Sequence, residues 1–293
     1  MDIKKLLFVT KFNDLSFNAL QSLLCLRSAC LNHVVLANVI ERDKVAMQRG
    51  LGYKKSEEVR LRETANIRFI DWAENLFEQG MEVGVYIVVG NLIKKVIEAA
   101  EKEQADLIVI GRSRKRFIDQ LYQGSDVTEI IRQAAIPVLV YKPPTDRIDL
   151  LDKPFGRPLL AIDWSPASTQ AEELLLPLKG LIQKINIVHV ADEKDLKGSA
   201  MEIQKVRKQC RAKLEKIVDR FEDHGIEASA HVYIGDPNEE IERAAADCQS
   251  SMIVMGSSGK SAWSERWLGS TPRAIAERSD YPTLVVPPIK PNG

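Results

Sequence analysis

The sequence predicts an α/β protein made of two tandem domains, each a five-stranded parallel sheet flanked by helices. Short apolar runs of strand length alternate with longer amphipathic runs of helix length, which is typical of βαβ units. This alternation occurs twice along 293 residues, a length that itself favours two domains. Each half also ends in an apolar run that is stopped by a proline pair, at 143/144 and 287/288.

The first half contains five strand patterns with helix patterns between them. The predicted strands are residues 5–10, 33–40, 82–89, 106–110 and 137–141. The predicted helices are residues 15–31, 54–79, 92–104 and a short helix that ends at 134. The helix at 54–79 is predicted from apolar side chains that recur at near-helical spacing, namely Val59, Ile67, Ile70, Ala73 and Phe77.

The second half repeats this pattern. Its predicted strands are residues 159–163, 185–190, 228–234, 251–255 and 282–286. A helix is predicted at 167–181, a long one ends near 221, and two more follow the third and fourth strands. Asp236 is expected to cap the first of these two, with Pro237 in its first turn. Ser270 or Thr271 is expected to cap the second.

One constant offset aligns the two halves over most of their length. It pairs Gly90 with Gly235, Ile108 with Ile253, Gly111 with Gly256, Gly124 with Gly269, Ser125 with Ser270, and Pro137 with Pro282. A fixed offset over so long a run indicates internal duplication. We therefore predict a first domain at 1–144, a second domain at 158–293, and a linker at 145–157 that is rich in proline and charge.

The composition is that of an ordinary globular protein without a strong overall charge. Lysine plus arginine equals aspartate plus glutamate at 41 each, so no overall field attracts nucleic acid or a membrane surface. No apolar run approaches the length of a membrane span. The four cysteines form no CxxC pair, which favours buried, reduced thiols in a cytoplasmic protein.

The stretch 256–271, GSSGKSAWSERWLGST, links a predicted buried strand to a helix N-terminus. A Walker A loop would need a glycine at Val254, and no G-x-G-x-x-G follows a strand, so both of those phosphate loops are excluded. Backbone N–H groups of a glycine-containing loop and the positive end of a helix can still hold a phosphate chain together.

The spacing Gly256-x2-Gly259-x9-Gly269-Ser270 resembles the nucleotide loop of the universal stress protein family, and the whole chain resembles a tandem member of it. The resemblance implies two Rossmann-like domains that pair as a pseudo-dimer, and an adenine nucleotide (ATP, ADP or AMP, with or without Mg²⁺) in the second. The residues that it implies for binding are Ala161, Asp163, Val190, Met255, Gly256, Gly259, Gly269, Ser270 and Thr271. Taken by itself, Asp163 is favoured as the cap of the helix near Ala167; alongside the complete loop, the ligand role is favoured.

The first half departs from this pattern at two positions. Thr10 stands where Asp163 stands in the second half, and Arg114 replaces the glycine that matches Gly259. The bulk of an arginine would crowd a phosphate, so we expect the first half to have lost the nucleotide site. Its basic loop at 112–116 is expected to be a solvated loop and not a nucleic-acid site, since no aromatic residues are interleaved there.

Three functions follow from these observations. The leading one, implied by the resemblance, is a nucleotide-binding regulatory protein of the stress response. The second is a slow ATPase or nucleotidyl-transfer enzyme that uses the same pocket, although the sequence offers no general-base constellation and no catalytic residue is assigned. The third is a nucleotide-free interaction module, which failure of the purified protein to bind any nucleotide would favour.

The apolar run that ends each half is expected to lie at a sheet edge and to invite pairing with another strand. Because the linker tethers the two domains, these final strands should pair within one chain. Homodimerisation of the tandem chain is left open by the sequence.

Replacing Leu139 and Leu284 with lysine is therefore expected to separate the two domains, because a charge in each final strand opposes burial of a shared interface. Small-angle scattering should then report a longer particle. An unchanged scattering profile from a folded double variant would contradict the intrachain pairing.

Overall fold

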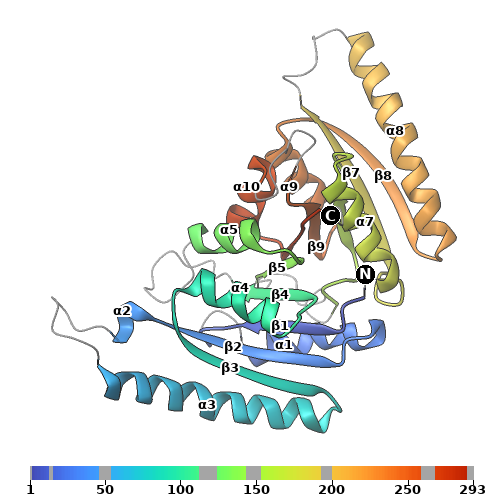
Figure 1. Cartoon of the computed structure of the whole chain (residues 1–293). Coiled ribbons are helices and arrows are strands. Elements are labelled where there is room, and N and C mark those ends of the chain that lie inside the picture. Colours follow the sequence, from blue (N-terminus) through green and yellow to red (C-terminus); the bar gives the residue numbers. More distant parts are fainter. Residues whose placement is uncertain are drawn as a thin grey trace, which may run out of the picture. The chain divides into compact units, whose positions relative to one another are not determined.

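The computed structural model describes residues 2–12, 16–45, 54–111, 124–142, 153–192, 200–258 and 268–288 (Figure 1). The chain divides into two compact units, Ile3–Tyr141 and a second unit that begins at Lys142. Both are α/β, as the alternation of patterns predicted.

The first unit is a parallel sheet with the strand order β3-β2-β1-β4-β5. Its elements are β1 (Lys5–Val9), α1 (Phe17–Leu23), a 3-10 helix (Leu24–Ala29), β2 (His33–Glu41), α2 (Arg42–Val45), α3 (Lys55–Glu78), β3 (Glu82–Gly90), α4 (Leu92–Lys102), β4 (Leu107–Gly111), α5 (Gly124–Gln133) and β5 (Val138–Tyr141). All of β4 and β5 is buried, which explains their continuous apolar sequence.

The second unit has the same strand order, β8-β7-β6-β9-β10, and is again parallel. Its elements are β6 (Pro158–Ala161), α7 (Pro166–Leu175), a 3-10 helix (Leu176–Leu178), β7 (Lys184–Asp192), α8 (Ala200–Asp223), β8 (Glu227–Gly235), α9 (Pro237–Asp247), β9 (Met252–Gly256), α10 (Ser270–Arg278) and β10 (Thr283–Val286). The repeated order is what an internal duplication requires.

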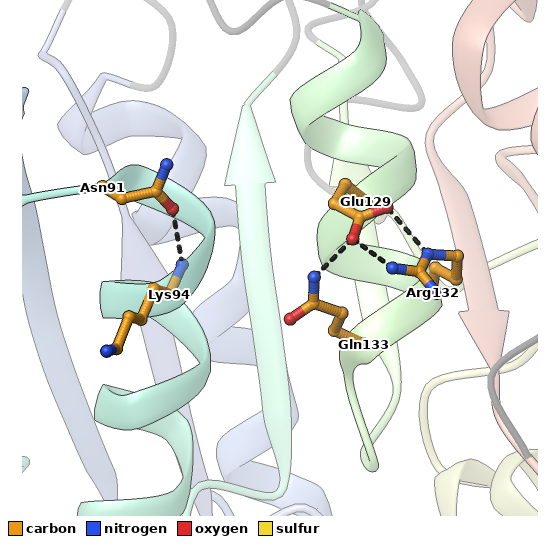
Figure 2. Close-up of polar contacts among 5 residues, drawn as sticks. All are labelled: Asn91, Lys94, Glu129, Arg132 and Gln133. Atoms are coloured by element: carbon orange, nitrogen blue, oxygen red, sulfur yellow. Dashed lines mark hydrogen bonds and ion pairs between the residues drawn. The ribbon is translucent and has the colours of Figure 1, made fainter.

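Side-chain caps begin several of the helices. Asn91 Oδ1 accepts a hydrogen bond from the Lys94 N–H at 3.0 Å and so caps α4 (Figure 2). Figure 2 also shows Glu129 on α5, which binds Arg132 and Gln133 on the following turn. The hydrogen bond from Arg132 lowers the pKa of Glu129 below its usual value. The predicted cap of α9 is confirmed, since the Asp236 carboxylate accepts the Asn238 N–H at 2.9 Å.

Helix α3 carries two apolar stripes, and only one of them packs on the sheet. The buried stripe consists of Ala65, Phe69, Trp72 and Leu76. The residues whose spacing predicted the helix lie largely on the other stripe: Val59, Ile67, Ile70 and Phe77 are all exposed, Phe77 to 76%. The aromatic stripe is buried because its rings meet aromatic rings from the sheet side, with Phe8 and Trp72 centroids 6.2 Å apart.

The last residues of the predicted linker pack into the second unit. Phe155 is 1% exposed, and the Gly156 carbonyl accepts the Gln183 N–H at 2.8 Å. Residues 143–152 lie outside the described residues.

All four cysteines are free thiols, but they differ in burial. Cys210 is buried as expected, whereas Cys30 is exposed at the left-handed end of the first 3-10 helix, where the chain turns out of the core. Among the described residues, no helix combines the length and apolar character that crossing a bilayer would require.

One buried carboxylate couples the stability of the second unit to pH. Glu172 on α7 is 6% exposed, and its Oε1 lies 2.7 Å from Arg220 Nη1 on α8. Burial raises the pKa of Glu172 above its usual value, although Arg220 opposes this shift. A raised folded-state pKa means that the stability contributed by this group is present below the unfolded-state pKa. That contribution is lost as pH rises through the folded-state pKa.

Replacing Glu172 with glutamine removes this titration. The free energy of unfolding of the variant, relative to the native protein, is expected to rise as the pH increases above the ordinary pKa of a glutamate, about 4. Urea denaturation at a series of pH values measures it. Glu173→Gln is the matched control, since that side chain is 44% exposed and 3.8 Å from Arg220. A difference that stays flat with pH for Glu172→Gln would contradict the expectation.

Candidate functional site

A cavity of about 290 Å³ lies in the second unit at the carboxyl ends of β6, β7 and β9. Strands β6 and β9 are the neighbours at which the strand order reverses direction, and ligands of open parallel sheets bind at such a point. The starts of α9 and α10 complete the wall. The lining residues are Ala161, Ile162, Asp163, Val188, His189, Val190, Pro237, Ile241, Met255, Gly256, Ser258, Gly269, Ser270, Thr271 and Pro272.

The fold brings the residues singled out in the sequence together around this cavity. Ala161, Asp163, Val190, Met255, Gly256, Gly269, Ser270 and Thr271 all line it. Gly259 lies outside the described residues, as does most of the loop that joins β9 to α10. That these side chains bind a ligand remains a prediction.

Asp163 follows β6 and does not cap α7. The cap is Ser165, whose Oγ accepts the Ser168 N–H at 3.1 Å. Asp163 Oδ1 accepts the Ser165 N–H at 2.9 Å, which shapes the turn before the helix. In the described part of the chain, Oδ2 of Asp163 has no hydrogen-bond partner, so the carboxylate keeps an acceptor at the cavity wall.

Gly256 is required by packing at the end of β9. A Cβ on this residue would lie 2.6 Å from the Ser168 backbone nitrogen and 2.7 Å from the Ala167 Cβ. Its φ is not in the left-handed region, so the absence of a side chain is needed for the approach of α7 and not for an unusual turn.

The N-terminus of α10 carries no side-chain cap. Ser270 or Thr271 was expected to cap this helix, but the cap is Gly269, and Ser270 and Thr271 occupy the first two helical positions. The cap moves back because the Gly269 N–H binds the Ser257 carbonyl at 2.9 Å, which holds the start of the helix beside β9. No hydrogen bond within the described residues reaches the Ser270 or Thr271 N–H, so both are available to an acceptor in the cavity.

His189 is a lining residue that the sequence did not single out, because it lay inside a strand pattern. It is 9% exposed, and its Nδ1 donates to the Ile162 carbonyl at 2.7 Å, so Nδ1 carries the hydrogen. The centroids of its ring and of the Trp164 ring lie 3.9 Å apart.

Trp164 does not itself line the cavity. Its φ of 60° turns the chain away from β6, and Lys213 Nζ lies 4.6 Å from its ring centroid.

The first unit uses the same backbone devices with different side chains. The pairing registers place Lys11, and not Thr10, at the position of Asp163, because Val9 pairs with Ala37 and Ile110 as Ala161 pairs with Val188 and Met255. The expected match of Thr10 with Asp163 is therefore wrong by one residue. Thr10 corresponds to Ile162, and its Oγ1 accepts the Phe12 N–H at 2.7 Å. Asn38 on β2 donates to the Thr10 carbonyl at 2.8 Å, in the manner of His189. Gly111 ends β4, whereas residues 112–123, which include Arg114, lie outside the described residues.

The described lining is electrostatically simple. Its titratable side chains are Asp163 and His189, and it contains no lysine or arginine. Within the described part of the chain, no group of three or more His, Cys, Asp or Glu side chains could hold a metal ion.

Comparison with known proteins identifies relatives that each match about half of the chain. A universal stress protein from Methanocaldococcus jannaschii is 29% identical over 153 residues, which cover 47% of this chain and 94% of that protein. Universal stress protein YxiE from Bacillus subtilis is 28% identical over 146 residues, covering 45% of this chain and 99% of that protein.

Two solved structures share the fold of nearly the whole chain. A universal stress protein from Archaeoglobus fulgidus has a TM-score of 0.73 at 19% identity, covering 98% of this chain and 97% of that one. A protein described as a putative universal stress protein from Pseudomonas aeruginosa has a TM-score of 0.65 at 18% identity, covering 98% and 94%. At such identities the likeness concerns the fold alone.

The profile of the universal stress protein family matches this chain twice, at residues 2–142 and at residues 154–287. The protein therefore belongs to the universal stress protein family and carries two of its domains in tandem.

Proposed function

We propose that the second unit binds one adenine nucleotide per chain and that the protein is a nucleotide-binding regulator of the stress response in the cytoplasm. The observation that carries the proposal is the cavity at the strand ends, which has an apolar side and a side formed by a helix N-terminus. Its volume of about 290 Å³ is near the lower end for small-molecule sites and suits a single mononucleotide.

The apolar side suits a nucleobase. Val188 and Val190 of β7, Met255 of β9 and Ile241 of α9 line it. Burying a flat base between such side chains is favourable, because it removes apolar surface from water. The strand ends beside the cavity offer backbone N–H and C=O groups to the polar edge of the base. Asp163, which keeps one carboxylate oxygen as an acceptor, is suited to a ribose hydroxyl or an exocyclic amino group.

The helix side suits phosphate. The N–H groups of Ser270 and Thr271 have no partner among the described residues, and the N-terminus of α10 carries the positive end of the helix dipole. A phosphate group would satisfy both amides. Because the described lining lacks basic side chains, these amides and the dipole supply the attraction that this part of the chain offers. A Mg²⁺ ion would enter with the phosphates.

Isothermal titration calorimetry with ATP, ADP and AMP, each with and without Mg²⁺, is expected to give one site per chain. Micromolar affinity is the expected order of magnitude for such a cavity. The motive for a single site is that Lys11 stands in the first half at the position of Asp163, so the carboxylate acceptor is missing there. Two equivalent sites, or none, would contradict the proposal; none would favour the interaction-module alternative.

Gly269→Asp is expected to weaken nucleotide binding while leaving the fold intact. The new carboxylate would cap α10, occupy its free amides and repel phosphate. Aspartate can adopt the φ of −62° found at this position. The dissociation constant should rise at least about tenfold, with the free energy of unfolding unchanged or a few tenths of a kcal/mol higher.

Gly269→Ala is the matched control, since it adds the Cβ, 3.2 Å from Pro272 Cδ, without an acceptor. It should bind nearly as the native protein does. If the alanine variant loses as much affinity as the aspartate variant, the effect is steric and the helix terminus is not the phosphate site.

A further inference from the structure

Strand β8 is the outermost strand of the second unit, and it pairs on one side only, with β7 (Figure 1). An edge strand presents a row of backbone N–H and C=O groups to which another strand can pair. Within the described residues, no side chain forms a hydrogen bond with the backbone of β8. This edge is therefore open along its described length.

The open edge lies in a basin lined with basic side chains. The basin has a volume of about 570 Å³ and is lined by Val232, Tyr233 and Ile234 of β8, Arg207, Lys208 and Arg211 of α8, and Glu240 and Arg243 of α9. Crossovers in parallel sheets are right-handed, so α8 and α9, which connect strands in opposite directions, cover opposite faces. The cations thus flank the edge of β8 from both sides.

Two of the four basic side chains in the basin have no ion-pair partner among the described residues, and a third is only loosely paired. Arg207 and Lys208 are exposed and have no ion-pair partner in the described part of the chain. Arg243 lies 3.7 Å from Glu240 and 3.9 Å from Asp247, which is beyond hydrogen-bonding distance. Arg211 alone makes a close pair, with Glu215 at 2.6 Å.

The corresponding edge of the first unit is occupied at one of its outward carbonyls. Arg62 of α3 matches Arg207, and its Nη1 donates to the Ile87 carbonyl of β3 at 2.8 Å. The Glu82 N–H binds Asn32 toward β2, and because residues of a strand alternate, Ile87 directs its carbonyl outward. Ile87 matches Val232, whose carbonyl receives no such bond.

We propose that the edge of β8 binds an extended, acidic segment of a partner protein by strand addition. Backbone hydrogen bonds to β8 would supply the pairing, and carboxylates of the segment would meet Arg207, Lys208 and Arg243. A peptide fits better than a nucleic acid, because the floor of the basin is a strand edge with half-buried apolar side chains. Its N–H and C=O groups match another backbone at about 3.3 Å per residue.

The test uses the full chain and a fluorescein-labelled peptide of about eight residues, the length of an ordinary strand, that alternates glutamate and valine. Fluorescence anisotropy is expected to show binding. The same peptide N-methylated on every amide keeps the charge but cannot donate ladder bonds, so it should bind at least about tenfold more weakly. Equal binding of the two peptides, or no binding of either, would overturn the proposal.

The variant Arg207→Glu/Lys208→Glu should weaken binding of the unmodified peptide at least about tenfold through charge reversal. Lys205→Glu/Lys216→Glu is the matched control: it makes the same charge change on the same helix at exposed positions outside the basin, and should change affinity less than about twofold. Equal losses in both variants, or a single-stranded oligonucleotide that binds more tightly than the peptide, would show a general polyanion surface and overturn strand addition.

Discussion

The cavity of the second unit depends on one constraint, the direction in which the chain adds strands to its sheet. From β6 the chain adds β7 and β8 on one side, and it then crosses back to add β9 and β10 on the other. Right-handed crossovers send the helices of these two halves to opposite faces, so no helix covers the carboxyl ends of β6 and β9. Gly256 then allows the start of α7 to approach the end of β9 closely.

The sequence predicted the strands to within a few residues because most of them are buried on both faces and read as continuous apolar runs. It predicted the cap of α9 because Asp236 and Pro237 form a local signal. It misplaced the cap of α10, since Gly269 becomes the cap only through the bond from its N–H to Ser257 across the loop. Such a contact depends on the tertiary path and leaves no trace in local spacing.

Two further features, the buried stripe of α3 and the place of His189 at the cavity, could not be predicted from local sequence either. The apolar residues of α3 form two stripes of similar spacing, and which stripe is buried is decided by the rings that the sheet offers. The sequence around His189 is an ordinary strand pattern and does not mark this residue as part of a site. Its position at the cavity follows from where β7 passes the end of β6. The two units preserve the turns after their first strands, with Phe12 and Trp164 both at positive φ. They differ in the side chain that accepts an N–H of the turn: the Thr10 hydroxyl in the first unit, and in the second unit the carboxylate of Asp163, which stands one position later.

The bond from Arg62 to the Ile87 carbonyl has a consequence for how copies of this chain can associate. A molecule with two different open edges could join head to tail and grow into a filament without limit. Here Arg62 already occupies the outward Ile87 carbonyl of one edge, which hinders strand addition there and favours β8 as the edge through which strands of two copies could pair. That contact is self-complementary and stops at two molecules, and the like charges of Arg207 and Lys208 on each copy would oppose it. The asymmetry of the two edges therefore works against open-ended polymerisation.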